Sequence, residues 1–128
     1  MDEDKIQARR REQDEEATRR RASILGLQYL DGREFEDTLP LLKDVLTIEE
    51  MYKGRLVPLA FNEEDQSYRF GVTSQTSESL MKRMRDQYVE NGKRIFFFLI
   101  SGSAFRSIML RFDPPKKVIY DNIEIAKE

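Results

Sequence analysis

The sequence contains no cysteine, no histidine and no tryptophan. Without cysteine the chain forms no disulfide, offers no thiolate nucleophile and cannot bind zinc through sulfur. Without histidine it lacks the commonest general base and the commonest metal ligand. A Ser–Lys dyad would be another nucleophilic arrangement, but no spacing in the sequence indicates one. We therefore expect no catalytic residue, no cofactor and no metal in this chain.

Long hydrophobic runs are also missing, and charge is abundant. The 128 residues allow one domain, 36% of them are charged, and the mean hydropathy is −0.66. The formal net charge of −2 gives no overall field that would attract nucleic acid or anionic lipid. The acidic first four residues are not followed by the apolar segment of a secretory signal. The sequence predicts a cytoplasmic protein without direct membrane insertion.

The most apolar run is residues 94–100, Arg-Ile-Phe-Phe-Phe-Leu-Ile. It shows no alternation of apolar and polar residues, which predicts a central strand that is covered on both faces. Asn91-Gly92 before it is typical of a helix end, and Ser101-Gly102-Ser103 after it of a turn and helix start. The run is too short to cross a membrane, which takes about 20 residues. Because Phe96 to Phe98 belong to this buried strand, we do not expect them to stack on nucleic-acid bases.

Residues 1–21 are almost entirely charged, and the basic and acidic side chains balance. Only Ile6, Ala8 and Ala17 are suited to packing, which is too little for a buried face. We interpret the segment as a solvated leader, either helix or tail, or as a linker. Its two arginine triplets also suggest a nucleic-acid arm, but the interleaved acids weaken that interpretation.

Residues 22–113 have the pattern of an α+β domain. The residue patterns predict a small mixed or antiparallel sheet of about four strands covered by amphipathic helices. We expect strands at 27–30, 55–61, 68–73 and 94–100, and helices ending near 26 and starting near 47, 76–77 and 103.

Single residues refine these expectations. The two strands at 55–61 and 68–73 form a hairpin, and Pro58 places the first of them at an edge or on a bulge. The helix after Thr76 carries Met81 and Met84, which we interpret as core residues rather than a partner groove. The double proline after Asp113 ends the last helix. Residues 114–128 are then a linker or an edge strand.

Two motifs resemble sites but lack the required spacing. Gly92-Lys93 is the only Gly-Lys pair, yet Gln87 stands where a phosphate-binding loop needs glycine and Arg94 where it needs a hydroxyl. The acidic cluster between Asp31 and Asp37 lacks the spacing of a calcium loop. We expect a helix end at the first and a solvated turn at the second.

The order of elements resembles the N-terminal domain of the type II secretion and type IV pilus assembly ATPases, the GspE/PilB group. The resemblance covers about residues 17–125. It rests on the segments Ala-Ser-Ile-Leu-Gly-Leu-Gln-Tyr-Leu-Asp at 22–31, Leu-Thr at 46–47, Val-Pro-Leu at 57–59 and Phe-Gly-Val-Thr at 70–73. In that family the last of these strands is followed by a helix, a strand, a helix and a linker. Ser74-Gln75 departs from the family's Asp-Pro, and the arginine-led motif that binds cyclic di-GMP in some members is missing.

The resemblance implies a non-catalytic regulatory and docking domain. Its partners would be the cytoplasmic face of an inner-membrane platform, or the platform's linker protein, and a C-terminal ATPase domain with Walker motifs. We expect such a domain to lie in the cytoplasm, held at the inner membrane through its partners, and to bind no nucleic acid. The expected docking residues are Arg83, Arg85 and the edge at Pro58. The alternative is a sensor for a nucleotide or cyclic dinucleotide, with phosphate contacts from Arg19, Arg20, Arg21 and Arg94.

Overall fold

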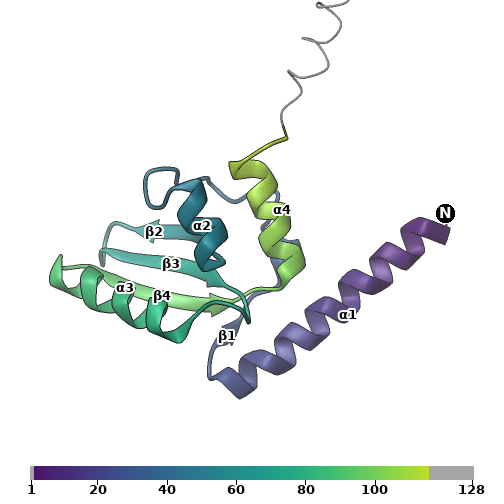
Figure 1. Cartoon of the computed structure of the whole chain (residues 1–128), viewed down its shortest axis with the longest axis horizontal. Helices are drawn as coiled ribbons and strands as arrows, with labels where there is room; N and C mark the ends of the chain where they lie inside the picture. The colour runs from purple at the N-terminus through teal and green to yellow at the C-terminus, as the bar shows by residue number, and fades with distance from the viewer. Residues whose placement is uncertain (1, 116–128) are drawn as a thin grey trace, which may run out of the picture.

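The structure is a computed structural model that describes residues 2–115. Four α-helices, one short 3₁₀ helix and four strands make up this part of the chain (Figure 1). In chain order the elements are α1 (Asp2–Leu25), β1 (Gln28–Tyr29), η1 (Gly32–Glu34), α2 (Ile48–Gly54), β2 (Leu56–Asn62), β3 (Ser67–Val72), α3 (Glu78–Glu90), β4 (Arg94–Leu99) and α4 (Gly102–Phe112). The strand or linker expected beyond Pro115 lies outside the described residues.

The strands form one mixed sheet in the order β1-β4-β3-β2. β4 is parallel to both β1 and β3, whereas β2 and β3 form an antiparallel hairpin. A parallel neighbour needs a crossover connection, and α3 supplies it between β3 and β4. The predicted α+β class, the four-stranded sheet and the central position of residues 94–99 are confirmed.

β2 is an edge strand, as the proline in it predicts. It is the last strand in the order β1-β4-β3-β2, which confirms the edge position. Its pairing with β3 shifts register between Pro58 and Ala60, which confirms the bulge. The proline side chain is nevertheless fully buried.

The core lies on both sides of the sheet. One cluster joins α3 to the sheet through Met81, Met84, Phe70 and Phe97, which confirms that both methionines are core residues. The other cluster joins α4, α2 and the segment before α2 to Ile100 and to Val57 and Leu59 of β2. α4 buries its apolar face at Ala104, Phe105, Ile108, Met109 and Phe112.

The coverage of β4 differs from the expectation. Ile95, Phe97 and Leu99 are buried, but Phe96 on the opposite face is 43% exposed and Phe98 is half-buried. The second apolar cluster contains Ile100 and the β2 residues Val57 and Leu59 but neither Phe96 nor Phe98, because α4 starts directly after β4 and lies over that end of the sheet. The prediction of two fully covered faces is therefore wrong within residues 2–115.

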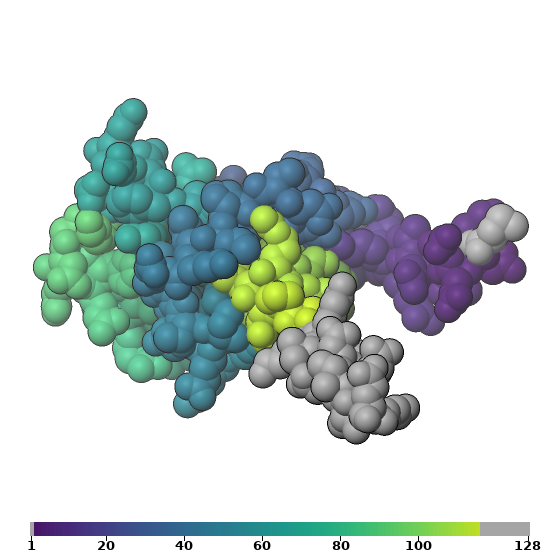
Figure 2. Space-filling view, turned by 90° about the horizontal axis from the view of Figure 1, so that it is seen from above, coloured from purple at the N-terminus to yellow at the C-terminus, as the bar shows by residue number. Residues whose placement is uncertain are grey.

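α1 also differs from the expectation. It is one continuous helix, so the boundary expected between residues 21 and 22 falls inside it. Residues 2–10 are exposed and project beyond the sheet and the other helices (Figures 1 and 2). Glu15 is buried at 0% exposure, so the prediction of a solvated segment over residues 1–21 is wrong at this residue. Ala22, the first residue of the expected domain, is buried at 3% exposure.

Candidate functional site

The predicted docking residues Arg83 and Arg85 both lie exposed on α3. Ser77 caps this helix: its hydroxyl accepts a hydrogen bond from the backbone N–H of Leu80, which confirms the helix start expected near 76–77. Residues two apart on a helix are about 200° apart around its axis, so the two arginines point to different sides. Each of them lines a separate groove beside α3.

The larger hollow, which we call the α1–α3 groove, has a volume of about 890 Å³. It runs between the last turn of α1 and the first half of α3, and Leu25, Leu27 and Met81 supply apolar lining. Lys82 and Arg85 contribute positive charge to its wall, and Glu78 contributes one acid.

Two features set the character of the α1–α3 groove. The Arg85 guanidinium lies 5.1 Å from the centre of the Phe97 ring, a cation–π contact that holds the arginine over the sheet. Ile24, next to the groove residue Leu25, is 84% exposed. An apolar floor with a basic wall suits a ligand that carries apolar and acidic groups together.

The second hollow, the α2–α3 groove, has a volume of about 610 Å³. Arg83 lines it together with Lys53 and Glu50 from α2, and Leu46 and Leu80 supply apolar surface. Pro58 lines neither groove, and its buried side chain has no free surface for a partner.

The four arginines expected at a phosphate do not converge. Arg19 forms an ion pair with Glu16 at 2.7 Å, and its guanidinium lies 5.6 Å from the centre of the Tyr29 ring. Tyr29 is aligned with Leu99, so Arg19 lies near the last residue of β4. Arg20 and Arg21 are exposed on α1, whereas Arg94 begins β4 at the opposite end of the strand. The structure therefore separates Arg94 from the α1 triplet.

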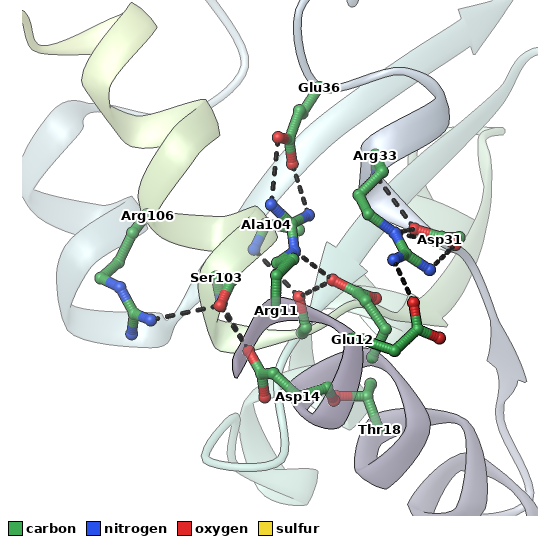
Figure 3. Close-up of polar contacts among 12 residues, drawn as sticks. Arg11, Glu12, Asp14, Thr18, Asp31, Arg33, Glu36, Ser103, Ala104 and Arg106 are labelled. Atoms are coloured by element: carbon green, nitrogen blue, oxygen red, sulfur yellow. Dashed lines mark hydrogen bonds and ion pairs between the residues drawn. The ribbon is translucent and has the colours of Figure 1, made fainter. Parts of the chain in front are cut away.

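A polar network that the sequence analysis missed attaches α1 to the body of the protein (Figure 3). The buried Glu15 carboxylate accepts hydrogen bonds from Arg11 Nε at 2.7 Å, Tyr29 Oη at 2.5 Å and Ser101 Oγ at 2.6 Å. Burial, followed by the bond to Glu15, raises the pKa of Tyr29 above its ordinary value.

The neighbouring acid of α1 binds the first turn of α4. Asp14 Oδ2 accepts hydrogen bonds from the Ser103 backbone N–H at 3.1 Å and from Ser103 Oγ at 2.6 Å. The N-cap of α4 is Ser101, two residues before the helix start expected near 103, and its hydroxyl accepts a hydrogen bond from the Ala104 N–H. Carboxylates at a helix N-terminus are favoured because the unpaired N–H groups and the helix dipole attract negative charge.

Arginines extend the network to the segment after β1. Arg11 holds the Glu36 carboxylate with two nitrogens, at 2.7 and 3.2 Å, and this bonding raises the pKa of Arg11. Arg33 donates to Glu12 and Asp31, and its bonds lower the pKa of the Asp31 carboxyl. The sequence did contain a signal for this docked face: Arg11, Glu15, Thr18 and Ala22 follow the 4-3-4 spacing of one helical stripe.

The hydrogen-bonding groups of the network are all satisfied. Within residues 2–115 every buried side-chain nitrogen or oxygen has a hydrogen-bond partner. The same part of the chain holds no group of three acidic, histidine or cysteine side chains placed to bind a metal ion. None of its helices is long and apolar enough to cross a membrane. The network positions α1, and α1 in turn forms one wall of the α1–α3 groove.

No protein-family model matches this chain, and no curated protein or solved structure is significantly similar to it.

Proposed function

We propose that this chain is a non-catalytic docking and regulatory domain that binds a protein partner in the α1–α3 groove. The proposal rests on one observation: the apolar Leu25, Leu27 and Met81 lie in one hollow with the basic Lys82 and Arg85. Ile24, beside this hollow, is the most exposed large apolar side chain within residues 2–115. An amphipathic helix that carries acidic residues along one side of its apolar stripe has the matching chemistry.

The partner helix would lie along the groove with its apolar stripe on Ile24 and Leu25. Burial of one such side chain on binding contributes about 2 kcal/mol. Lys82 and Arg85 would face the acids of the partner, and these charges would set its orientation and its rate of association more than its affinity.

We further propose that the domain belongs to a type II secretion or type IV pilus assembly ATPase. The order α3, β4, α4 after the β2–β3 hairpin agrees with the order that the resemblance implies and supports this assignment. The partner would then be the cytoplasmic linker protein of the inner-membrane platform, and the domain would reach the membrane only through it. The chain alone would not hydrolyse ATP.

The first test is partner capture, measured by biolayer interferometry with the cytoplasmic region of that linker protein. Leu25→Asp and Arg85→Glu should each weaken binding by roughly tenfold or more, because each changes a residue that lines the groove. Leu110→Asp is the matched control, since Leu110 is 57% exposed on α4 and away from the groove lining. Equal binding by all these variants would refute the groove as the docking site.

A second test addresses the longer ATPase and the sensor alternative. An immunoblot of cell lysate with an antibody to this domain should detect a product several times larger than 15.2 kDa. Calorimetric titration with ATP or a cyclic dinucleotide should give no saturable heat. The hollow that Arg21 lines with Ser74 and Gly102 holds about 130 Å³, whereas small-molecule sites have about 300–1,000 Å³. A product of about 15 kDa, or saturable heat, would contradict the proposal.

A further inference from the structure

The sheet face opposite α3 is incompletely covered at the Arg94 end of β4. Phe96 and Phe98 are two residues apart and therefore point to the same face, where Phe96 is 43% exposed. A strand that is apolar on both faces is typical of a sheet covered on both sides. In residues 2–115 only the opposite face of β4, with Ile95 and Phe97, is buried along its length. β4 therefore has the composition of a strand that is covered on both faces, but residues 2–115 bury only one of them along its length.

The neighbouring strands extend this apolar centre. Arg69 of β3 is aligned with Phe96 of β4 and with Ala60 of β2, so the three residues form a row across the sheet. The Arg69 guanidinium lies 6.0 Å from the Phe98 ring centre. We call the surface formed by Ala60, Arg69, Phe96 and Phe98 the open sheet face.

Charges of both signs border the open sheet face. Arg69 and Arg94 are exposed, and Glu63 and Glu64 from the β2–β3 turn line a hollow of about 450 Å³ together with Ala60 and Arg69. None of these four charged side chains is in an ion pair within residues 2–115. A surface with an apolar centre and unpaired charges of both signs is complementary to a second copy of itself where a two-fold axis brings unlike charges together.

We propose that the open sheet face binds a second copy of this chain in an isologous, two-fold contact. Phe96 of each copy packs near the two-fold axis, and Arg69 of each copy pairs with the acidic turn of the other at Glu63 and Glu64. The net charge of −2 opposes this association only weakly. The contact uses none of the residues that line the α1–α3 groove, so it is independent of the proposed function.

The charges beside the open sheet face favour a second copy of this chain over nucleic acid. Single-stranded nucleic acid also stacks on aromatic residues of a sheet. Its phosphates would meet the acids at Glu63 and Glu64, whereas a second copy brings an arginine to each acidic turn.

Sedimentation equilibrium of the full chain tests the proposal. The wild-type mass should rise with concentration from 15.2 kDa towards twice that value. Phe96→Glu should weaken the dimer by roughly tenfold or more, because it places a charge at the centre of the contact. Val89→Glu is the matched control: Val89 is 65% exposed on α3, and its replacement should leave the mass unchanged. Circular dichroism checks that both variants stay folded. A wild-type chain that is monomeric at hundreds of micromolar, or an equal effect of both variants, would overturn the proposal.

Exchanging the charges of Arg69 and Glu64 tests the proposed ion pairs between the two copies directly. Arg69→Glu and Glu64→Arg should each weaken self-association, since each juxtaposes like charges across the axis. A mixture of these two variants should form a heterodimer, because both Arg–Glu contacts then have opposite charges again. Failure of the mixture to recover the dimer mass would refute the pairing. Binding of a fluorescent single-stranded oligonucleotide that Phe96→Glu abolishes, with a monomeric wild type, would assign the face to nucleic acid instead.

Discussion

The Glu15 carboxylate accepts a 2.6 Å hydrogen bond from the hydroxyl of Ser101, a residue 86 positions further along the chain. The same hydroxyl accepts a bond from the Ala104 N–H and thereby caps α4. One serine thus starts α4 and holds α1, which links the position of the long helix to the C-terminal end of the central strand.

Glu15→Ala should destabilise the protein by about 3 kcal/mol. The substitution removes the shared acceptor and leaves the hydroxyls of the half-buried Tyr29 and the buried Ser101 without this partner. Urea unfolding followed by circular dichroism measures the change. Glu16→Ala is the control, because Glu16 pairs with Arg19 at the surface and should cost no more than about 1 kcal/mol. Similar losses in both variants would contradict the special role of the buried carboxylate.

Arg11→Lys should lower stability by about 1–2 kcal/mol although it keeps the charge. The guanidinium holds Glu36 with two nitrogens and Glu15 with a third, and an ammonium cannot reproduce that geometry. Arg10→Lys, at an exposed position of the same helix, should change the free energy of unfolding by less than about 0.5 kcal/mol. If Arg11→Lys is neutral in urea unfolding, the bidentate contact is not what stabilises α1 on the body.

Gly32→Ala should destabilise the protein by about 1–3 kcal/mol because of steric overlap. A Cβ at this position would lie 2.3 Å from Ala104 Cβ, so η1 and α4 would have to separate. Gly102→Ala is a matched control, since its Cβ would meet only the flexible end of Arg106, at 3.4 Å. Thermal unfolding should show a lower Tm for the first variant alone. If Gly32→Ala and Gly102→Ala had the same Tm, η1 and α4 would accommodate the added Cβ without loss of stability.

Stability should decline as the pH rises above about 10. The pKa of Tyr29 is raised from its ordinary value of 10.0, first by burial and then by its bond to Glu15. A group whose pKa is higher in the folded state stabilises the protein fully below its unfolded pKa, and this contribution is lost at higher pH. Burial also raises the pKa of Tyr88, which adds to the decline.

Tyr29→Phe isolates the contribution of this residue to the alkaline decline. The variant should be less stable at pH 7, because Glu15 loses a donor, but its stability should fall less steeply between pH 9 and 11 than that of the wild type. Urea unfolding at these pH values measures both effects. Equal slopes in the two proteins would refute the role of Tyr29 in the alkaline loss.

The sequence by itself determined the elements whose signals are local. α2 starts where the sequence predicts, near residue 47, with a capping box: Thr47 Oγ accepts from the Glu50 N–H, and the Glu50 carboxylate accepts from the Thr47 N–H. The hairpin, the bulge near Pro58 and the buried methionines of α3 also follow from short-range patterns. Such signals are readable because the interacting residues are neighbours on one helix, strand or turn.

Only the tertiary structure decided how α1 docks and which face of β4 stays open. A stripe of charged residues has no apolar periodicity, and Glu15 is buried only because Tyr29 and Ser101 arrive from distant parts of the chain. The exposure of Phe96 depends on where α4 turns back over the sheet, not on the residues of β4. The separation of Arg94 from Arg19 likewise follows from the direction of β4, which begins at Arg94 and ends at Leu99, next to Tyr29 and Arg19. The stripe from Arg11 to Ala22 indicates a docked face of α1, but the residues that this face contacts, like the other features, depend on long-range geometry.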